Sequence, residues 1–134
     1  MYEVWRTSVL ATHDFLTESD FAEICLQVRQ DYLPNGDFTV AVDDTDRVIG
    51  FLDVKGNEII SLFIAPTFRR QGLGRRFVAE AASREADIEV DVNAQNSQAV
   101  GFYNAMGFCT ISSMQADRDG RPYPLLRMRR SGFH

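Results

Sequence analysis

Apolar residues spaced three and four apart predict two helices at the start of the chain. The first is predicted from Glu3 to Leu10 and the second from about Phe21 to Gln30, with Ser19-Asp20 as the N-terminal cap of the second. The residues that form the two apolar stripes are Val4, Trp5, Ser8 and Val9 in the first helix and Phe21, Ile24, Cys25 and Val28 in the second. The sequence Leu33-Pro34-Asn35-Gly36 is predicted to end the second helix.

Short β-type runs alternate with turn residues through the middle of the chain. They cover 38–42, 47–54 and 58–64, and the turn clusters 43–46 and 55–57 separate them. The third run is almost wholly apolar, which is typical of a strand covered on both faces. Three strands joined by turns this short predict an antiparallel meander.

The second half of the chain alternates helix and strand patterns. Helices are predicted over 73–83 and 96–106, the latter stopping at Gly107, and strands over 88–92, 108–114 and 125–129. The polar run 117–122 is a turn. The resulting order, ααβββαβαββ, predicts a mixed α/β (α+β) fold, and 134 residues fit one domain spanning 1–134.

The net charge of −5 argues against nucleic acid or an anionic membrane as a partner of the whole chain. Two local groups of arginines keep nucleic-acid binding as a weak alternative: Arg69, Arg70, Arg75 and Arg76, and Arg127, Arg129 and Arg130. No run approaches the roughly 18 apolar residues of a membrane span. The start of the chain lacks the pattern of a secretory signal, so a cytoplasmic location is expected.

The two cysteines, Cys25 and Cys109, have neither the spacing of a zinc site nor that of a disulfide framework. Both stand among apolar neighbours. We therefore expect two small buried side chains in a reducing compartment and no metal site.

The segment from Arg69 to Arg76 follows a predicted strand and opens a predicted helix. Gly72 and Gly74 let its backbone turn N–H groups toward an anion, and the helix adds its positive end. Arginine suits phosphate geometry. The absence of Lys here excludes a P-loop, and Phe77 replaces the third glycine of the dinucleotide fingerprint. The alternative interpretation is a solvated loop shaped by its glycines.

A second informative segment runs from Asn96 to Phe108. On a helix, Asn96, Ala99 and Tyr103 lie along one face because they are three and four residues apart. A phenol with an ordinary pKa near ~10 is a proton donor at neutral pH. The alternative is that Phe102 and Tyr103 are core aromatics and that Asn96 is a helix cap.

Taken together, the two segments resemble the GNAT superfamily of N-acetyltransferases. The resemblance is carried by Arg69-x-x-Gly72-x-Gly74 and by Asn96-x-x-Ala99-x-x-Phe102-Tyr103-x-x-x-Gly107-Phe108, and it extends over about 38–129. The segments 11–16 (ATHDFL) and 120–126 (GRPYPLL) further resemble a group of small bacterial GNAT proteins whose acceptors are largely unknown.

The resemblance implies an acyltransferase with acetyl-coenzyme A as donor and an amine as acceptor. The amine, on a small molecule or a protein, would attack the thioester directly, and Tyr103 would protonate the departing thiolate. The positions implied to bind the cofactor are Phe63, Ile64, Arg69, Arg70, Gln71, Gly72, Leu73, Gly74, Arg75, Asn96 and Tyr103.

The general base stays open between His13 and Glu58. His13 has a suitable ordinary pKa and stands in a loop that borders the acceptor site in this fold, whereas Glu58 opens a strand where some relatives carry a carboxylate. The positions expected to contact the acceptor are His13, Asp14, Phe15 and Tyr123.

The family usually begins with a β-strand, but this sequence begins with a predicted helix. Either that strand is missing, or another segment or a second subunit covers the sheet edge. An uncovered edge is a liability, so a homodimer is one form of the second expectation. An alternative function from another class is an acyl-coenzyme A sensor with little catalysis.

Overall fold

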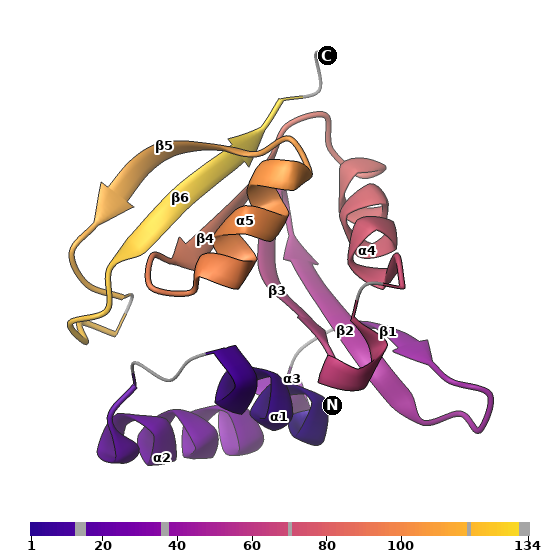
Figure 1. The fold of residues 1–134 in the computed structure, drawn as a ribbon, viewed down its shortest axis with the longest axis vertical. Helices are drawn as coiled ribbons and strands as arrows, with labels where there is room; N and C mark the ends of the chain where they lie inside the picture. The colour runs from indigo at the N-terminus through magenta and orange to yellow at the C-terminus, as the bar shows by residue number, and fades with distance from the viewer. Residues whose placement is uncertain (13–15, 36–37, 70, 118, 132–134) are drawn as a thin grey trace. The chain divides into compact units, whose positions relative to one another are not determined.

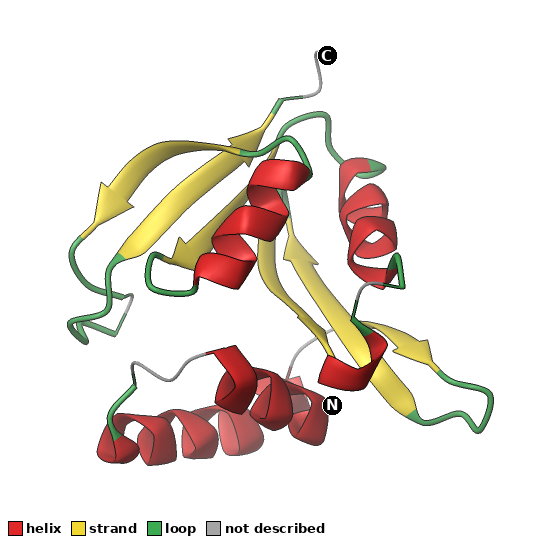
Figure 2. Ribbon diagram, in the orientation of Figure 1, coloured by secondary structure: helices red, strands yellow, loops and turns green. Residues whose placement is uncertain are grey.

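The computed structural model of the chain contains helices and one six-stranded sheet (Figures 1 and 2). The strand order is β1-β2-β3-β4-β6-β5, and every strand pairing described is antiparallel except that of β3 with β4. The structure describes all residues except 13–15, 36–37, 70, 118 and 132–134. The element order matches the predicted ααβββαβαββ pattern of a mixed α/β fold.

The residues group into two compact units. The first unit comprises Met1–Asp53 and Ser61–Gly74, and the second comprises Val54–Ile60 and Arg75–His134. The division crosses β2, β3 and the first turn of α4, so the chain passes from one unit to the other within elements.

The first unit begins with helices α1 (Tyr2–Thr12) and α2 (Glu18–Gln27). The α2 cap is Thr17, whose hydroxyl accepts a bond from the Asp20 backbone N–H at 3.1 Å, so the predicted Ser19-Asp20 cap is wrong. Thr17 precedes two acidic residues, Glu18 and Asp20, that favour the helix N-terminus.

Helical structure continues past the predicted stop at Leu33. A π-helical turn, η1 (Val28–Tyr32), and a short α-helical piece, α3 (Leu33–Asn35), follow α2 directly. Proline fits the first turn of a helix, where its missing N–H has no partner to lose, so Pro34 does not break the chain at this point.

Strands β1 (Thr39–Val42), β2 (Val48–Lys55) and β3 (Glu58–Ile64) form the predicted meander, and the 3₁₀ turn η2 (Pro66–Phe68) follows. The buried core of the first unit combines both stripes of the helices with Phe51 of β2, which is fully buried. The predicted stripe of α1 is confirmed, since Val4, Trp5, Ser8 and Val9 are all buried.

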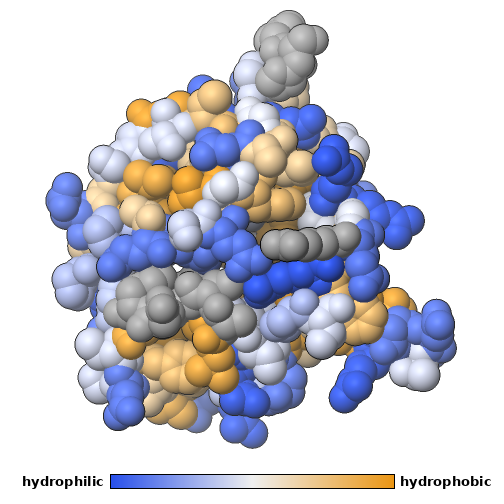
Figure 3. Space-filling view, viewed as in Figure 1, coloured by the Kyte–Doolittle hydropathy of each residue, from blue (hydrophilic) through white to orange (hydrophobic). Residues whose placement is uncertain are grey.

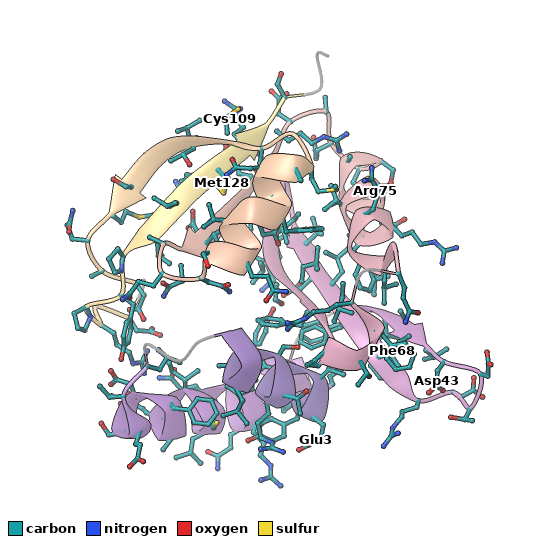
Figure 4. The ribbon with its side chains drawn as sticks, in the orientation of Figure 1. Glu3, Asp43, Phe68, Arg75, Cys109 and Met128 are labelled. Carbon is teal, nitrogen blue, oxygen red and sulfur yellow. The ribbon has the colours of Figure 1, made fainter. Side chains whose placement is uncertain are left out.

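The second unit contains α4 (Leu73–Ala82), β4 (Ile88–Asn93), α5 (Ser97–Ala105), β5 (Cys109–Met114) and β6 (Leu125–Arg130). β6 lies between β4 and β5, and α5 packs against β4 (Figure 1). Ile88, Val90 and Val92 of β4 are buried, as is Met128 of β6 (Figure 4). Gly107 has φ +94, which confirms it as the residue that ends α5.

Cys109 corrects the prediction of two buried cysteines. It is exposed at the start of β5, while Cys25 is half-buried on α2, and both are free thiols (Figure 4). β5 is an edge strand of the sheet, and five of its six residues are exposed. The apolar neighbours of Cys109 in the sequence therefore do not bury it, because this strand as a whole contributes little to the core.

Hydrophilic and hydrophobic residues intermingle on the face of the protein seen in Figure 3. Over the residues that the structure describes, no helix has the length and apolar character needed to span a membrane. No cluster of three or more potential metal ligands is found among the same residues, either.

Candidate functional site

The glycine-containing segment of the first unit follows β3 and η2 directly. Gly72 has φ +82, a left-handed conformation that side-chain-bearing residues rarely adopt, and a Cβ built there meets no atom within 4 Å. Leu73 then begins α4, whose first turn contains no acidic residue. The backbone therefore turns at Gly72, beside open space, and enters a helix with its free N–H groups leading.

The arginines around this turn differ in their surroundings. Burial lowers the pKa of Arg69, which is half-buried, while Arg75 and Gln71 are exposed. Gly74 is buried within the first turn of α4. Arg70 lies outside the described residues.

Arg75 also lines a surface hollow that lies wholly within the second unit. The hollow has a volume of about 410 Å³ and is bordered by one face of α4, the end of α5 and the end of β6. Its lining residues are Arg75, Val78, Ala79, Ala82, Ser83, Ala105, Met106 and Arg130. Two guanidinium groups at an otherwise uncharged surface suit an anionic ligand. Figure 4 places Arg75 on α4.

Asn96 is the N-cap of α5. Its side-chain oxygen accepts a hydrogen bond from the Ala99 backbone N–H at 3.1 Å, and the residue is 8% exposed. A cap of this kind satisfies one of the free N–H donors at the start of the helix. The alternative interpretation of Asn96 as a helix cap predicts this bond. The remaining surface of its amide is small.

Tyr103 lies on the same helix and is buried. Its ring makes edge-to-face contacts with Phe102 and Phe108, at centroid distances of 5.0 and 5.2 Å. Burial raises the pKa of its phenol above the ordinary 10.0. The group is therefore neutral at physiological pH and keeps a proton to donate. The aromatic contacts also fit the interpretation of a core residue.

Glu58, one of the two candidate bases, belongs to a charged cluster in the second unit. It opens β3 opposite Glu89 of β4, and its charge raises the pKa of Arg127 after the larger effect of Asp91. Phe63 and Ile64 end the same strand, five and six residues later. Glu58 therefore lies at the other end of β3 from the segment implied to bind the cofactor.

The predicted acceptor residues are only partly described. Tyr123 is buried in the second unit, at 6% exposure, beside the turn that Asp117 stabilises through bonds from the Asp119 and Arg121 N–H groups. His13, Asp14 and Phe15 lie outside the described residues, so the roles predicted for them stay predictions.

The first unit contains a buried polar cluster that was not predicted from the sequence. The Tyr32 hydroxyl donates to Asp53 Oδ2 at 2.7 Å and also bonds to the Ser61 hydroxyl. The available signal was Asp53 itself, a carboxylate two residues after Phe51 in an apolar strand. Residues two apart on a strand share a face, so the pattern places this carboxylate in the core.

Comparison with known proteins shows a consistent likeness. Residues 11–129 match the model of the acetyltransferase (GNAT) domain family. The chain is 42% identical over 125 residues to peptidyl-lysine N-acetyltransferase YjaB of Salmonella typhimurium, covering 93% of this chain and 86% of that protein.

Solved structures show the same likeness. The solution structure of apo-form YjaB from Escherichia coli has a TM-score of 0.91 at 40% identity, covering 96% of this chain and 87% of that one. The PaiA N-acetyltransferase of Thermoplasma acidophilum, solved with coenzyme A, has a TM-score of 0.75 at 21% identity, covering 97% and 89%. This chain therefore belongs to the acetyltransferase (GNAT) family and is an acyltransferase.

Proposed function

We propose that this protein transfers the acetyl group of acetyl-coenzyme A to the side-chain amine of a lysine in a peptide or protein. The observation that carries the proposal is the left-handed turn at Gly72 leading into α4. The acceptor class follows from the 42% identity to a relative named peptidyl-lysine N-acetyltransferase. Acetyl-coenzyme A supplies an activated thioester when bound.

The residues around Gly72 fit the pyrophosphate of the donor. The first N–H groups of a helix have no intrahelical partner, and the helix dipole adds positive charge at this end. Open space beside Gly72 leaves room for phosphate oxygens, and a Glu side chain there would bring bulk and negative charge. In the proposal, backbone groups from 71 to 74 hold the pyrophosphate, and β3 residues Phe63 and Ile64 lie beside the pantetheine arm.

The second unit has a candidate anion site of its own. Arg75 and Arg130 border the 410 Å³ hollow and offer it positive charge. Asn96, the N-cap of α5, is proposed to touch the donor.

Tyr103 is proposed as the general acid. When the amine attacks the thioester carbonyl, the carbon–sulfur bond breaks and the departing sulfur needs a proton. A phenol whose pKa is raised by burial stays protonated until that moment. The amine must arrive uncharged, so a second group has to take its proton.

Calorimetric titration of acetyl-coenzyme A tests the donor site. Wild-type protein is expected to bind, and Gly72→Glu is expected to lose binding while remaining folded. Gly56→Glu is the matched control, since Gly56 also has positive φ (+61) and open space around it but lies in the β2–β3 turn. Equal losses in both variants would trace the effect to backbone strain and would contradict the proposed site.

Steady-state acetylation of a lysine-containing peptide tests the general acid. Tyr103→Phe is expected to lower kcat about 10²-fold, within the usual range for acid–base catalysis, with unchanged binding of acetyl-coenzyme A. Tyr2→Phe in α1 is the control for loss of a phenol. Wild-type protein that binds the donor tightly and acetylates no amine in a broad panel would favour the sensor function instead.

A further inference from the structure

Three side chains from three elements form one chain of hydrogen bonds inside the first unit. Tyr32 ends the π-helical turn η1, Asp53 lies on β2 and Ser61 lies on β3. Asp53 is 1% exposed and Ser61 is 8% exposed. Polar side chains so deeply buried are uncommon unless their bonds are satisfied or they have a role in function.

The number of hydroxyl protons decides which group donates and which accepts in each of these hydrogen bonds. A phenol has a single O–H, and that of Tyr32 donates to Asp53 Oδ2 at 2.7 Å. The bond between Tyr32 and Ser61 must then have the Ser61 hydroxyl as donor and the Tyr32 oxygen as acceptor. The Ser61 oxygen keeps lone pairs that can accept a further proton. The donor-to-acceptor direction of these hydrogen bonds is therefore the same throughout, from Ser61 through Tyr32 to Asp53.

The surroundings of the cluster suit a group that receives a proton. Burial raises the pKa of the Tyr32 phenol, which therefore stays neutral and passes a proton on without ionising. A row of aromatic rings in contact leads away from the cluster. Tyr32 packs edge-to-face on Phe38, Phe38 packs edge-to-face on Phe51, and Phe51 lies against Phe63. Among the described residues of the first unit, Asp53 forms no ion pair, and Tyr32 is the titratable group that faces it.

The position of Ser61 connects the cluster to the proposed reaction. Ser61 and Phe63 are two residues apart on β3, about 7 Å along the strand. Phe63 and Ile64 are the residues proposed to lie beside the donor's pantetheine arm. The Ile64 carbonyl accepts the Ser8 hydroxyl of α1 at 2.8 Å, which fixes this end of the strand.

We propose that Ser61, Tyr32 and Asp53 form the proton relay that deprotonates the acceptor amine, an inference that rests on the proposed acetyl transfer. The ammonium N–H gives its proton to the Ser61 oxygen, directly or through one bridging water. The Ser61 proton moves to the Tyr32 oxygen, and the Tyr32 proton moves to Asp53. The products are a neutral amine and a protonated Asp53, which returns its proton to solvent after each turnover.

The peptide acetylation rate measured against pH tests the relay. Asp53→Asn keeps an oxygen for Tyr32 but cannot take a proton. It is expected to lower kcat/KM for the peptide about 10²-fold near pH 7, with unchanged acetyl-coenzyme A binding by calorimetry. The loss is expected to shrink toward about pH 10, where a lysine amine with an ordinary pKa near ~10.4 loses its proton in solution. A structural defect would give the same loss at both pH values and would overturn the relay.

Ser61 provides a second, independent pair of variants. Ser61→Ala removes the entry hydroxyl and is expected to repeat the pH-dependent loss, whereas Ser61→Thr keeps the hydroxyl and most of the rate. Equal rates in Ser61→Ala and Ser61→Thr would overturn the relay even where Asp53→Asn fails to fold. Wild-type protein that acetylates no lysine peptide overturns the proposed function, whereas normal wild-type activity with an active Asp53→Asn overturns the relay alone.

Discussion

Two polar clusters in this protein use carboxylates in opposite ways. In the first unit, Asp53 is enclosed, with a phenol and a serine hydroxyl in its cluster. In the second unit, Asp91 of β4 faces Arg127 of β6, which donates to both carboxylate oxygens at 2.9 and 3.1 Å. The Arg127 side chain is 39% exposed, so water reaches that pair.

The difference separates a stabilising use of charge from a functional one. A carboxylate whose two-pronged arginine partner is half-exposed is compensated in charge, and such pairs add modestly to stability. A buried carboxylate with neutral partners forgoes hydration and an opposite charge, which costs stability in most proteins. A group kept at such a cost is a candidate for chemistry, as the relay requires.

Among variants of the two clusters, Tyr32→Phe is expected to have the largest effect on the free energy of unfolding. The substitution removes the donor to Asp53 and leaves a buried carboxylate unsatisfied, which lowers the free energy of unfolding by about 2 kcal/mol. Urea denaturation measures the change, with Tyr2→Phe as the matched phenol deletion. A loss no greater than that of the control would show that Asp53 finds another partner.

Asp53→Asn is expected to change stability much less than Tyr32→Phe. The amide keeps an acceptor for the Tyr32 hydroxyl and removes the buried charge, so the free energy of unfolding stays within about 1 kcal/mol of wild type. In this background, adding Tyr32→Phe is expected to cost about 1 kcal/mol less than it does alone. Additive losses in the double-mutant cycle would contradict the energetic coupling of the two side chains.

Asp91→Asn tests the compensated cluster and is expected to have a smaller effect. Loss of the charge partner of Arg127 lowers the free energy of unfolding by about 0.5 kcal/mol, because the guanidinium can rehydrate. The effect should shrink as the salt concentration rises. Urea denaturation at low and high salt measures it, and a loss larger than that of Tyr32→Phe would reverse the comparison.

The smallest effect concerns Asp43, an exposed carboxylate in the β1–β2 turn. Its pKa is lowered first by the Thr45 hydroxyl and then by the Thr45 and Arg47 N–H groups. Asp43 therefore contributes fully to stability at pH values above its ordinary pKa of 3.8. This contribution is lost as the pH falls through the lower pKa of the folded state. A carboxyl-carbon NMR titration checks it, and a midpoint above 3.8 would contradict the turn geometry.

The local sequence determined the helices, the strands and the tight turns of this protein, because these depend on interactions between residues close together in the chain. The spacing of Val4, Trp5 and Val9 marks the buried face of α1, and Gly72 and Gly107 both take the positive φ that their positions require. The order of helices and strands follows from the same local patterns. The two glycine- and aromatic-containing segments were sufficient for the family resemblance.

Only the tertiary structure decided which residues meet across the sequence. Tyr32, Asp53 and Ser61 come from three elements, and no spacing along the chain links a phenol to a carboxylate 21 residues away. The same holds for Cys109, whose apolar neighbours predicted burial, although it is exposed on an edge strand. Local periodicity reports which face of an element is apolar, whereas strand order and packing decide what covers that face and which polar groups it encloses.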